Sequence, residues 1–146
     1  RVRRPADAER ADLRMAYGSE VVELRRVRLA DHEPVCLETA VLSCRCIESV
    51  MAADLESGSL HEALISTGIV PTRGQATIGA EAATSDDAVL LGVKPGSPML
   101  VERRLIFDQR GKPIERTESR YAADRYGLDV GFSVEDGGAL AITTDV

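Results

Sequence analysis

Two arginines, Arg26 and Arg28, alternate with other residues in a stretch typical of a β-strand, and Glu38 follows in the next such stretch. Side chains alternate between the two faces of a strand, so both arginines point to one face. Guanidinium groups placed in this way can bind a phosphate or a carboxylate through charge-assisted hydrogen bonds. Glu38 could then accept hydrogen bonds from hydroxyl or amide groups of the same ligand. The alternative is a solvated outer face of a sheet, which also carries arginines.

A polar break at Asp31–Pro34 divides the stretch Val21–Leu42 and predicts a β-hairpin. The number of residues in its loop decides which face of the sheet Glu38 occupies. With an odd count, as in a three-residue or bulged hairpin, Glu38 lies opposite Arg26 on the same face. With an even count, Glu38 faces the other way. An exposed cross-strand ion pair is the other role open to Glu38, and such a pair stabilises little.

A helix is predicted to begin at Ser59, because a serine followed three residues later by Glu62 fits the pattern of a capping box. The first turn of a helix offers free N–H groups and the positive end of the helix dipole, which favour an anion. His61 lies in this turn and is expected on the helix surface or on the wall of a groove. Capping alone also explains Ser59, and the two roles are compatible.

The sequence supports few other kinds of active site. Its two histidines, His32 and His61, belong to no Ser-His-Asp, HExxH or Cys-His pattern, and glycine-rich nucleotide-binding motifs are absent. The three cysteines Cys36, Cys44 and Cys46 lack the second ligand pair of a zinc site and the even number of a disulfide framework. We therefore predict reduced thiols, no metal site and no cofactor.

The composition indicates one globular domain. The chain has 146 residues, of which 44% are hydrophobic and 29% are charged. Its net charge of −6 argues against a surface that binds a nucleic-acid backbone by itself. An apolar run of about 18 residues and a signal-peptide pattern are both absent, and a cytoplasmic location is predicted. Because the sequence begins at Arg1 and not at a methionine, we expect it to be part of a longer chain.

The spacing of apolar residues predicts the elements that position these side chains. Helices are predicted over 5–16, 47–55, 59–68 and 84–91, and strands over the two halves of 21–42 and over 70–83, 99–107 and 114–122. Residues 132–135 are expected to form a closing strand, and the chain from Asp136 onward is expected to be a loose tail.

Two copies of one unit follow each other 78 residues apart. Each copy contains a short helix, a Gly-Ser turn, a strand, a polar loop and a return strand. Two copies fit a pseudo-duplicated antiparallel sheet with helices on one face, so the predicted fold class is α+β. Arg28 departs from the repeat, because Ile106 stands at its place in the later copy. The matched residues are Ser19 with Ser97, Arg25-Arg26 with Arg103-Arg104, Leu29 with Phe107 and, after one extra loop residue, Pro34 with Pro113.

The chain resembles the effector-binding (UTRA) domain of HutC-type regulators in the GntR family of bacterial transcription factors. The resemblance implies a single effector-binding domain over 1–146, with a chorismate-lyase-like fold of a mainly antiparallel sheet and flanking helices, and no catalysis. It also implies a preceding winged helix-turn-helix domain, outside this sequence, through which a homodimer binds operator DNA, usually as a repressor. The matching stretches are LRRVRLADHEPVCLE (24–38), DLESGSLHEAL (54–64), LLGVKPGSPMLVERRLIFDQRGKPIERTESRY (90–121) and DRY (124–126).

The resemblance further implies a small metabolite as ligand, such as a sugar phosphate, an amino sugar or a carboxylate, whose binding alters operator affinity through the dimer. Arg26, Arg28 and Ser59 would hold its anionic end. Glu38 and Tyr121 would contact its polar remainder. His61 stands where a tyrosine is frequent in the family and is expected to line the pocket, whereas the DRY run is expected to be a structural anchor. The positions that contact phosphorylated amino sugars in similar proteins correspond to Arg26, Arg28, Glu38, Ser59 and Tyr121.

Two departures from the family pattern leave the effector open. Ala122-Ala123 stand where Arg-Gly or a similar pair is usual, and the ligand contacts that similar proteins have upstream of Arg1 lie outside this sequence. The alternative from another functional class is a chorismate-lyase-like enzyme acting on a small carboxylated substrate. A third alternative is a dimerising module whose pocket no longer binds a ligand.

Overall fold

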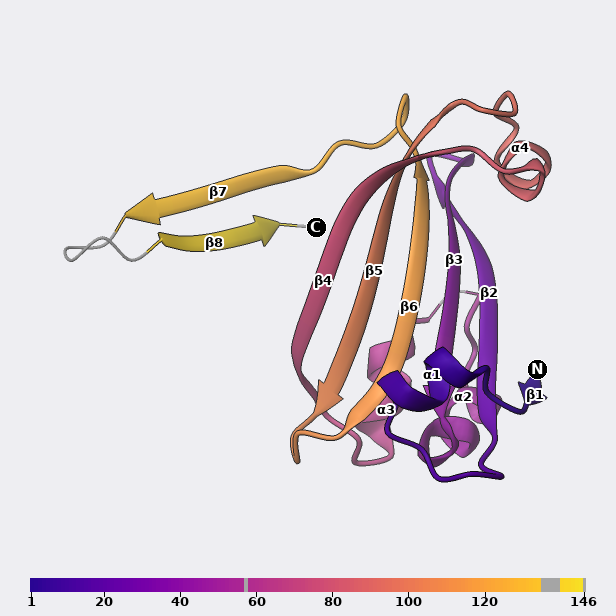
Figure 1. Ribbon diagram of the computed structural model, residues 1–146, viewed down its shortest axis with the longest axis vertical. Helices are drawn as coiled ribbons and strands as arrows, with labels where there is room; N and C mark the ends of the chain where they lie inside the picture. Colours follow the sequence, from indigo (N-terminus) through magenta and orange to yellow (C-terminus); the bar gives the residue numbers. More distant parts are fainter. Residues whose placement is uncertain (57, 135–139, 146) are drawn as a thin grey trace.

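A six-stranded antiparallel sheet forms the body of the computed structural model. The structure describes residues 1–56, 58–134 and 140–145, and for 130–134 and 140–145 it describes the backbone alone. The strand order is β1-β2-β3-β6-β5-β4 (Figure 1). The α+β class predicted from the sequence is confirmed. The strands of this sheet are β1 (Val2–Arg3), β2 (Val21–Ala30), β3 (Glu33–Ser43), β4 (Pro71–Ala82), β5 (Pro98–Asp108) and β6 (Pro113–Ala122).

Four α-helices are described, and they are shorter than the sequence predicts. The first ends near Leu13 because the following residue, Arg14, has a positive φ of 50° that a right-handed helix cannot continue through. A 3-10 turn over Cys44–Cys46 precedes the second. The helices are α1 (Asp7–Asp12), α2 (Ile47–Ala52), α3 (Leu60–Ser66) and α4 (Ser85–Leu91).

The internal repeat is visible in the pairing of the strands. The β2–β3 hairpin has a two-residue turn at Asp31-His32, and the register of its strands shifts between Arg28 and Leu29, before that turn. The β5–β6 hairpin has the same shift between Ile106 and Phe107. The extra residue of the first bulge makes the count odd, so Glu38 pairs directly with Arg26. The hairpin is therefore the bulged one of the two alternatives.

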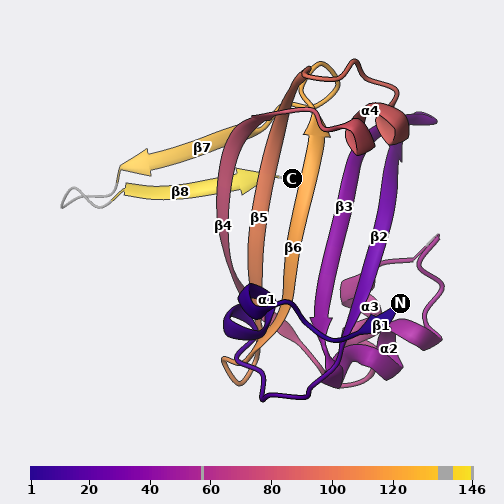
Figure 2. The same cartoon turned by 45° about the vertical axis from the view of Figure 1, so that its right-hand side comes forward.

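The helices cover both faces of the sheet (Figures 1 and 2). The prediction from the sequence, helices on one face, was wrong. The helices of the two copies lie on the same face. Leu91 of α4 packs with Leu37 and Met99, and Leu13 at the end of α1 packs with Val21. The connection between the copies contributes α2 and α3, and these two helices cover the other face. The repeat alone therefore accounted for only half of the helical cover.

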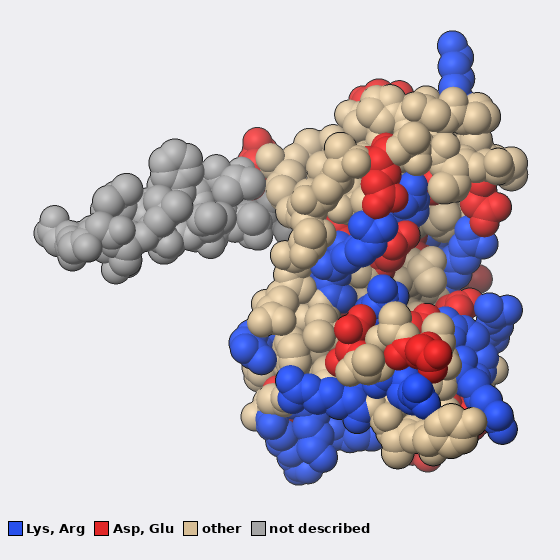
Figure 3. Space-filling view, in the orientation of Figure 1, with Lys and Arg blue, Asp and Glu red and all other residues tan. Residues whose placement is uncertain are grey.

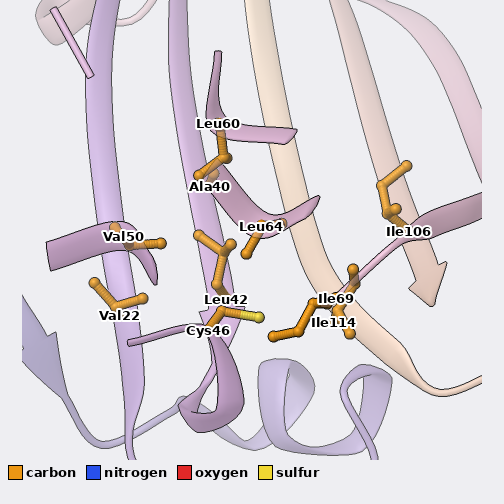
Figure 4. Packing of buried hydrophobic residues seen from close by; sticks show 10 residues of the cluster. All are labelled: Val22, Ala40, Leu42, Cys46, Val50, Leu60, Leu64, Ile69, Ile106 and Ile114. Carbon is orange, nitrogen blue, oxygen red and sulfur yellow. The ribbon is translucent and has the colours of Figure 1, made fainter. Parts of the chain in front are cut away.

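The main hydrophobic core lies between the sheet and the pair α2 and α3 (Figure 4). Leu42 of β3 and Leu64 of α3 are fully buried at its centre. The other buried members are Val22, Ala40, Cys46, Val50, Leu60, Ile69, Ile106 and Ile114. This cluster fixes α3 against the sheet.

Ion pairs occupy the opposite face between α1 and α4, where acidic and basic side chains alternate (Figure 3). Arg25 pairs with Asp86 of α4, and Arg103 pairs with both Glu81 and Glu118. These groups are substantially exposed, so each of these ion pairs contributes little to stability.

A separate hairpin follows the sheet and corrects the expectation of a closing strand and a loose tail. β7 (Asp129–Val134) pairs with β8 (Leu140–Asp145); β7 runs away from the six-stranded sheet and β8 runs back toward it (Figures 1 and 2). β8 was missed although it contains the run Ile142–Thr144, whose β-branched side chains favour strands. Glu135 and Asp136–Gly138 lie outside the described residues.

Candidate anion-binding pocket

A pocket of about 760 Å³ lies on the sheet face that carries α2 and α3. It unites five of the six predicted ligand contacts, Arg26, Arg28, Glu38, Ser59 and His61. The strands of the sheet carry most of its charged side chains and form one wall of the pocket. The segment before α3 forms the opposite wall. The remaining lining residues are Val27, Leu29, Leu55, Glu56, Gly58, Leu60, Arg104 and Glu115.

Three guanidinium groups surround the buried carboxylate of Glu38, whose side chain is 5% exposed. Arg26 donates from Nε to Oε1 at 3.1 Å and from one Nη to the same oxygen. Arg28 Nη1 and Arg104 Nη2 lie 3.9 Å and 4.0 Å from Oε2. One carboxylate therefore faces three cations, and this part of the pocket is suited to an anion.

A second buried carboxylate, Glu115, lies beside His61, whose Nε2 is 3.0 Å from one carboxylate oxygen. Thr117 donates its hydroxyl to the other oxygen. Burial alone would raise the pKa of Glu115, but the hydrogen bonds from His61 and Thr117 outweigh it and lower that pKa. The bond to Glu115 in turn raises the pKa of His61, against the opposing effect of burial. His61 thus gains positive charge near neutral pH beside the arginines.

This pairing predicts a pH-dependent contribution of His61 to stability. Because its pKa is raised on folding, the contribution is fully present below about pH 6.5 and is lost as the pH rises through the folded pKa. We expect the difference in unfolding free energy between the wild type and His61→Gln to shrink from pH 6 to pH 9, as measured by urea denaturation. A difference that stays constant over this range would contradict the role of the His61–Glu115 pair.

Ser59 is the N-cap of α3, and its hydroxyl accepts a hydrogen bond from the N–H of Glu62 at 3.4 Å. The predicted cap is thus confirmed. The side chain is exposed and lines the pocket, so capping and ligand contact remain compatible.

Tyr121, the sixth predicted contact, is not among the residues that line the pocket. It lies on the same sheet face as Glu38, but it is 4% exposed and its ring stacks on that of Tyr126, with centroids 3.9 Å apart. Burial raises the pKa of its hydroxyl to about 12. Contact between Tyr121 and a ligand stays a prediction.

The Asp124–Tyr126 run is an anchor, as the sequence predicted. Arg125 donates to the backbone carbonyls of Pro34 and Leu91, each at 2.7 Å. Its Nε also lies 3.1 Å from a carboxylate oxygen of Glu33. These contacts tie the chain after β6 to the β2–β3 hairpin and to the end of α4.

Arg104 and Glu115, which contact the charged groups of the pocket, were not predicted as site residues. The repeat contained a signal for the first, because Arg104 matches Arg26 in the duplicated unit. Glu115 lies among several other charged residues of β6, and no spacing in the sequence distinguishes it from them.

Within the part of the chain that the structure describes, no group of His, Cys, Asp and Glu is arranged to hold a metal ion. None of the helices in the same part is both long and apolar enough to cross a membrane. Cys36 and Cys46 are buried and Cys44 is exposed, all three as free thiols. Burial raises the pKa of the Cys36 thiol to about 12, which makes it a poor nucleophile.

Comparison with known proteins gives a consistent result. A family model described as UTRA domain matches residues 1–127. The HTH-type transcriptional repressor NagR of Bacillus subtilis is 27% identical over 117 residues, which cover 80% of this chain and 48% of that protein. The chain spans about half the length of the curated relatives it matches.

Solved structures share the fold. The effector domain of PhnF from Mycobacterium smegmatis superposes with a TM-score of 0.80 at 29% identity, covering 86% of this chain and 77% of that one. A GntR-family transcriptional regulator from Enterococcus faecalis has a TM-score of 0.79 at 24% identity, covering 90% of this chain and 94% of that one. At that lower identity the second likeness concerns the fold alone.

Proposed function

The chain belongs to the UTRA domain family, and from this premise we propose that it senses a small anionic or polar metabolite for a GntR-type transcriptional regulator. The observation that carries the proposal is the set of three guanidinium groups around one buried carboxylate in an open pocket. The effector is a sugar phosphate, an amino sugar or a carboxylate. Arg26, Arg28 and Ser59 hold its anionic end, and Glu38 and His61 contact its polar remainder.

The proposal for the whole protein includes a winged helix-turn-helix domain before residue 1 and a homodimer that binds operator DNA in the cytoplasm. The matched relatives are named as helix-turn-helix regulators, and about half of their length lies outside the match. An effector shifts such a protein only if it binds the two arrangements of the dimer with different affinity, and DNA and effector then affect each other reciprocally. The present chain contributes the effector site and not the DNA contact.

Catalysis is not part of the proposed function, since the named relatives are regulators. A turnover assay with chorismate tests the chorismate-lyase-like alternative directly. Conversion of chorismate by the wild type at a rate above background would replace the regulator proposal by the enzyme.

A thermal-shift screen of phosphorylated sugars, amino sugars and small carboxylates tests the proposal. A ligand that binds only the folded state raises the melting temperature, and the increase grows with the logarithm of the ligand concentration divided by Kd. We expect Arg28→Ala to bind the best compound roughly 10- to 100-fold more weakly, because charge-assisted hydrogen bonds to an anion are lost. Arg26→Ala should show a similar loss.

Arg25→Ala is the matched control. Arg25 is the sequence neighbour of Arg26 but lies on the other face, where it pairs with Asp86. Its replacement should leave the affinity unchanged. Wild-type affinity in both Arg26→Ala and Arg28→Ala would rule out the assigned site.

A further inference from the structure

The guanidinium groups of Arg28 and Arg104 donate no hydrogen bond within the described residues. Each carries five N–H donors in a fixed plane. Their nearest shared acceptor is Glu38 Oε2, at 3.9 Å and 4.0 Å, which is beyond hydrogen-bonding distance. Arg104 Nε is also buried without a hydrogen-bond partner in the described part of the chain, and Glu102 Oε2 lies 3.8 Å from it.

Unused donors are not a general property of arginines in this sheet. Arg120 on β6 donates four hydrogen bonds to Asp87, Glu81 and the carbonyl of Ala82. Arg103, the sequence neighbour of Arg104, donates to two carboxylates. Arg104 differs from these two arginines, because its guanidinium group donates no hydrogen bond within the described residues. Its side chain is only 26% exposed, so water reaches little of it. Arg73 on β4 also donates no hydrogen bond within the described residues, but its guanidinium group lies over the ring of Phe107. The unused donors of Arg104, and those of the half-exposed Arg28, line the pocket.

The repeat explains why Arg104 has no close carboxylate. In the first copy the residue paired across the strands with Arg26 is Glu38. Arg104 corresponds to Arg26, and the residue paired with it is Thr117, the counterpart of Glu38. The hydroxyl of Thr117 donates to Glu115 and is directed to that carboxylate. The second copy thus retains the arginine and replaces its acceptor by a threonine.

We propose that an oxyanion of the effector is the acceptor for Arg104, and that Arg28 binds the same oxyanion from β2, on the far side of β3 and β6. This inference rests on the proposed function, namely that the pocket binds a small anion. Arg28 Nη1 and Arg104 Nη2 lie 3.9 Å and 4.0 Å from the same oxygen of Glu38, so these two nitrogens are at most about 8 Å apart. A phosphate, phosphonate or carboxylate can accept from both at hydrogen-bonding distances of about 2.8 Å.

The charges around this position favour an anion. Three arginines face the carboxylates of Glu38 and Glu102, and Glu115 is paired with His61. Immediately around Glu38 the three guanidinium groups outnumber these two carboxylates, while Glu56, on the segment before α3, adds a negative charge to the pocket wall. Arg26 remains bonded to the other oxygen of Glu38, so binding the oxyanion leaves that buried pair in place. Arg104 becomes a specificity-determining residue on a strand that carries no other assigned contact.

Isothermal titration of the chain with glycerol 3-phosphate, glucosamine 6-phosphate and glycerate tests this role. We expect Arg104→Ala to weaken binding of the tightest probe at least tenfold, while Arg103→Ala stays within twofold of the wild type. Arg104→Lys retains the charge but loses the planar fork, so an intermediate loss is expected. Tighter binding of the phosphates than of glycerate identifies a phosphate or phosphonate, and the reverse identifies a carboxylate.

Thr117→Glu gives a second test in which no arginine is removed. It restores the carboxylate of the first copy beside Arg104 and should weaken the same probe as strongly as Arg104→Ala does. Thr117→Gln has the same shape without the charge and should bind several-fold more tightly than Thr117→Glu. Circular dichroism and melting temperature report whether each variant is folded.

The outcomes separate this inference from the proposed function. If Arg28→Ala loses binding and Arg104→Ala binds as the wild type does, the role of Arg104 is overturned and the pocket stands. If the wild type binds none of the three probes at millimolar concentration, both are overturned. Equal affinities of the two Thr117 variants would also contradict the inference.

Discussion

Arg120→Ala is expected to lower the free energy of unfolding by about 3 kcal/mol, because it leaves the carboxylate of Asp87 buried without its ion-pair partner. Arg120 Nε donates to both oxygens of Asp87, at 3.1 Å and 3.0 Å, and Asp87 is fully buried. Asp87 keeps its hydrogen bonds from Thr84 at the start of α4, so a loss in the lower part of the range for buried pairs is expected. Urea denaturation at pH 7 measures the change.

The matched control is Arg103→Ala on the same face of the sheet. Its partners Glu81 and Glu118 are substantially exposed, and exposed ion pairs contribute at most about 1 kcal/mol. Equal losses in the two variants would show that burial of Asp87 is not the cause. Arg120 also donates to the carbonyl of Ala82, so its loss frees the connection between β4 and α4.

The same pair predicts the direction of the pH dependence. Burial alone would raise the pKa of Asp87, but the hydrogen bonds from Thr84 and Arg120 outweigh it and lower that pKa. A carboxylate with a lowered folded pKa contributes stability above its unfolded pKa of about 3.9 and loses it as the pH falls through the folded value. The difference between the wild type and Arg120→Ala should therefore shrink below about pH 4.

Local patterns predicted the first half of the site, because its groups lie within one hairpin. Alternation along β2 placed Arg26 and Arg28 on one face, and the capping pattern placed Ser59 at a helix start. The face of Glu38 remained open, since it depends on the bulge at Arg28 and not on the composition of the turn. A two-residue turn with a bulge and a three-residue turn leave the same pattern in the sequence.

The second half of the site depends on pairing between strands that are distant in the sequence. Arg104 approaches Glu38 only because β6 pairs with both β3 and β5. That order follows from the packing of the whole sheet, which a linear pattern does not contain. The repeat held the needed information, since an arginine equivalent to Arg26 on a symmetric sheet faces the same side. Tyr121 was assigned to the ligand by similarity alone, and its contact with a ligand stays a prediction, since it lies on the face of Glu38 but is buried against Tyr126.

Leu64→Ala is expected to lower the free energy of unfolding by about 3 kcal/mol through the loss of buried methyl groups and the cavity left behind. Leu64 is fully buried in the core between α3 and the sheet. A helix of seven residues has little stability of its own, so packing of this kind holds α3 in place. Because Ser59 and His61 at the start of α3 form a pocket wall, we also expect weaker binding of the anion probes.

Ile65→Ala separates the packing effect from a general effect on helix formation. Ile65 is the next residue of α3 and is 50% exposed, so its truncation removes little buried surface and raises the helix propensity. Its unfolding free energy should stay within about 1 kcal/mol of the wild type, with unchanged affinity. A comparable loss in both variants would mean that the pocket wall depends on the helix itself. A loss confined to Leu64→Ala would show that the apolar core beneath the pocket positions its polar wall.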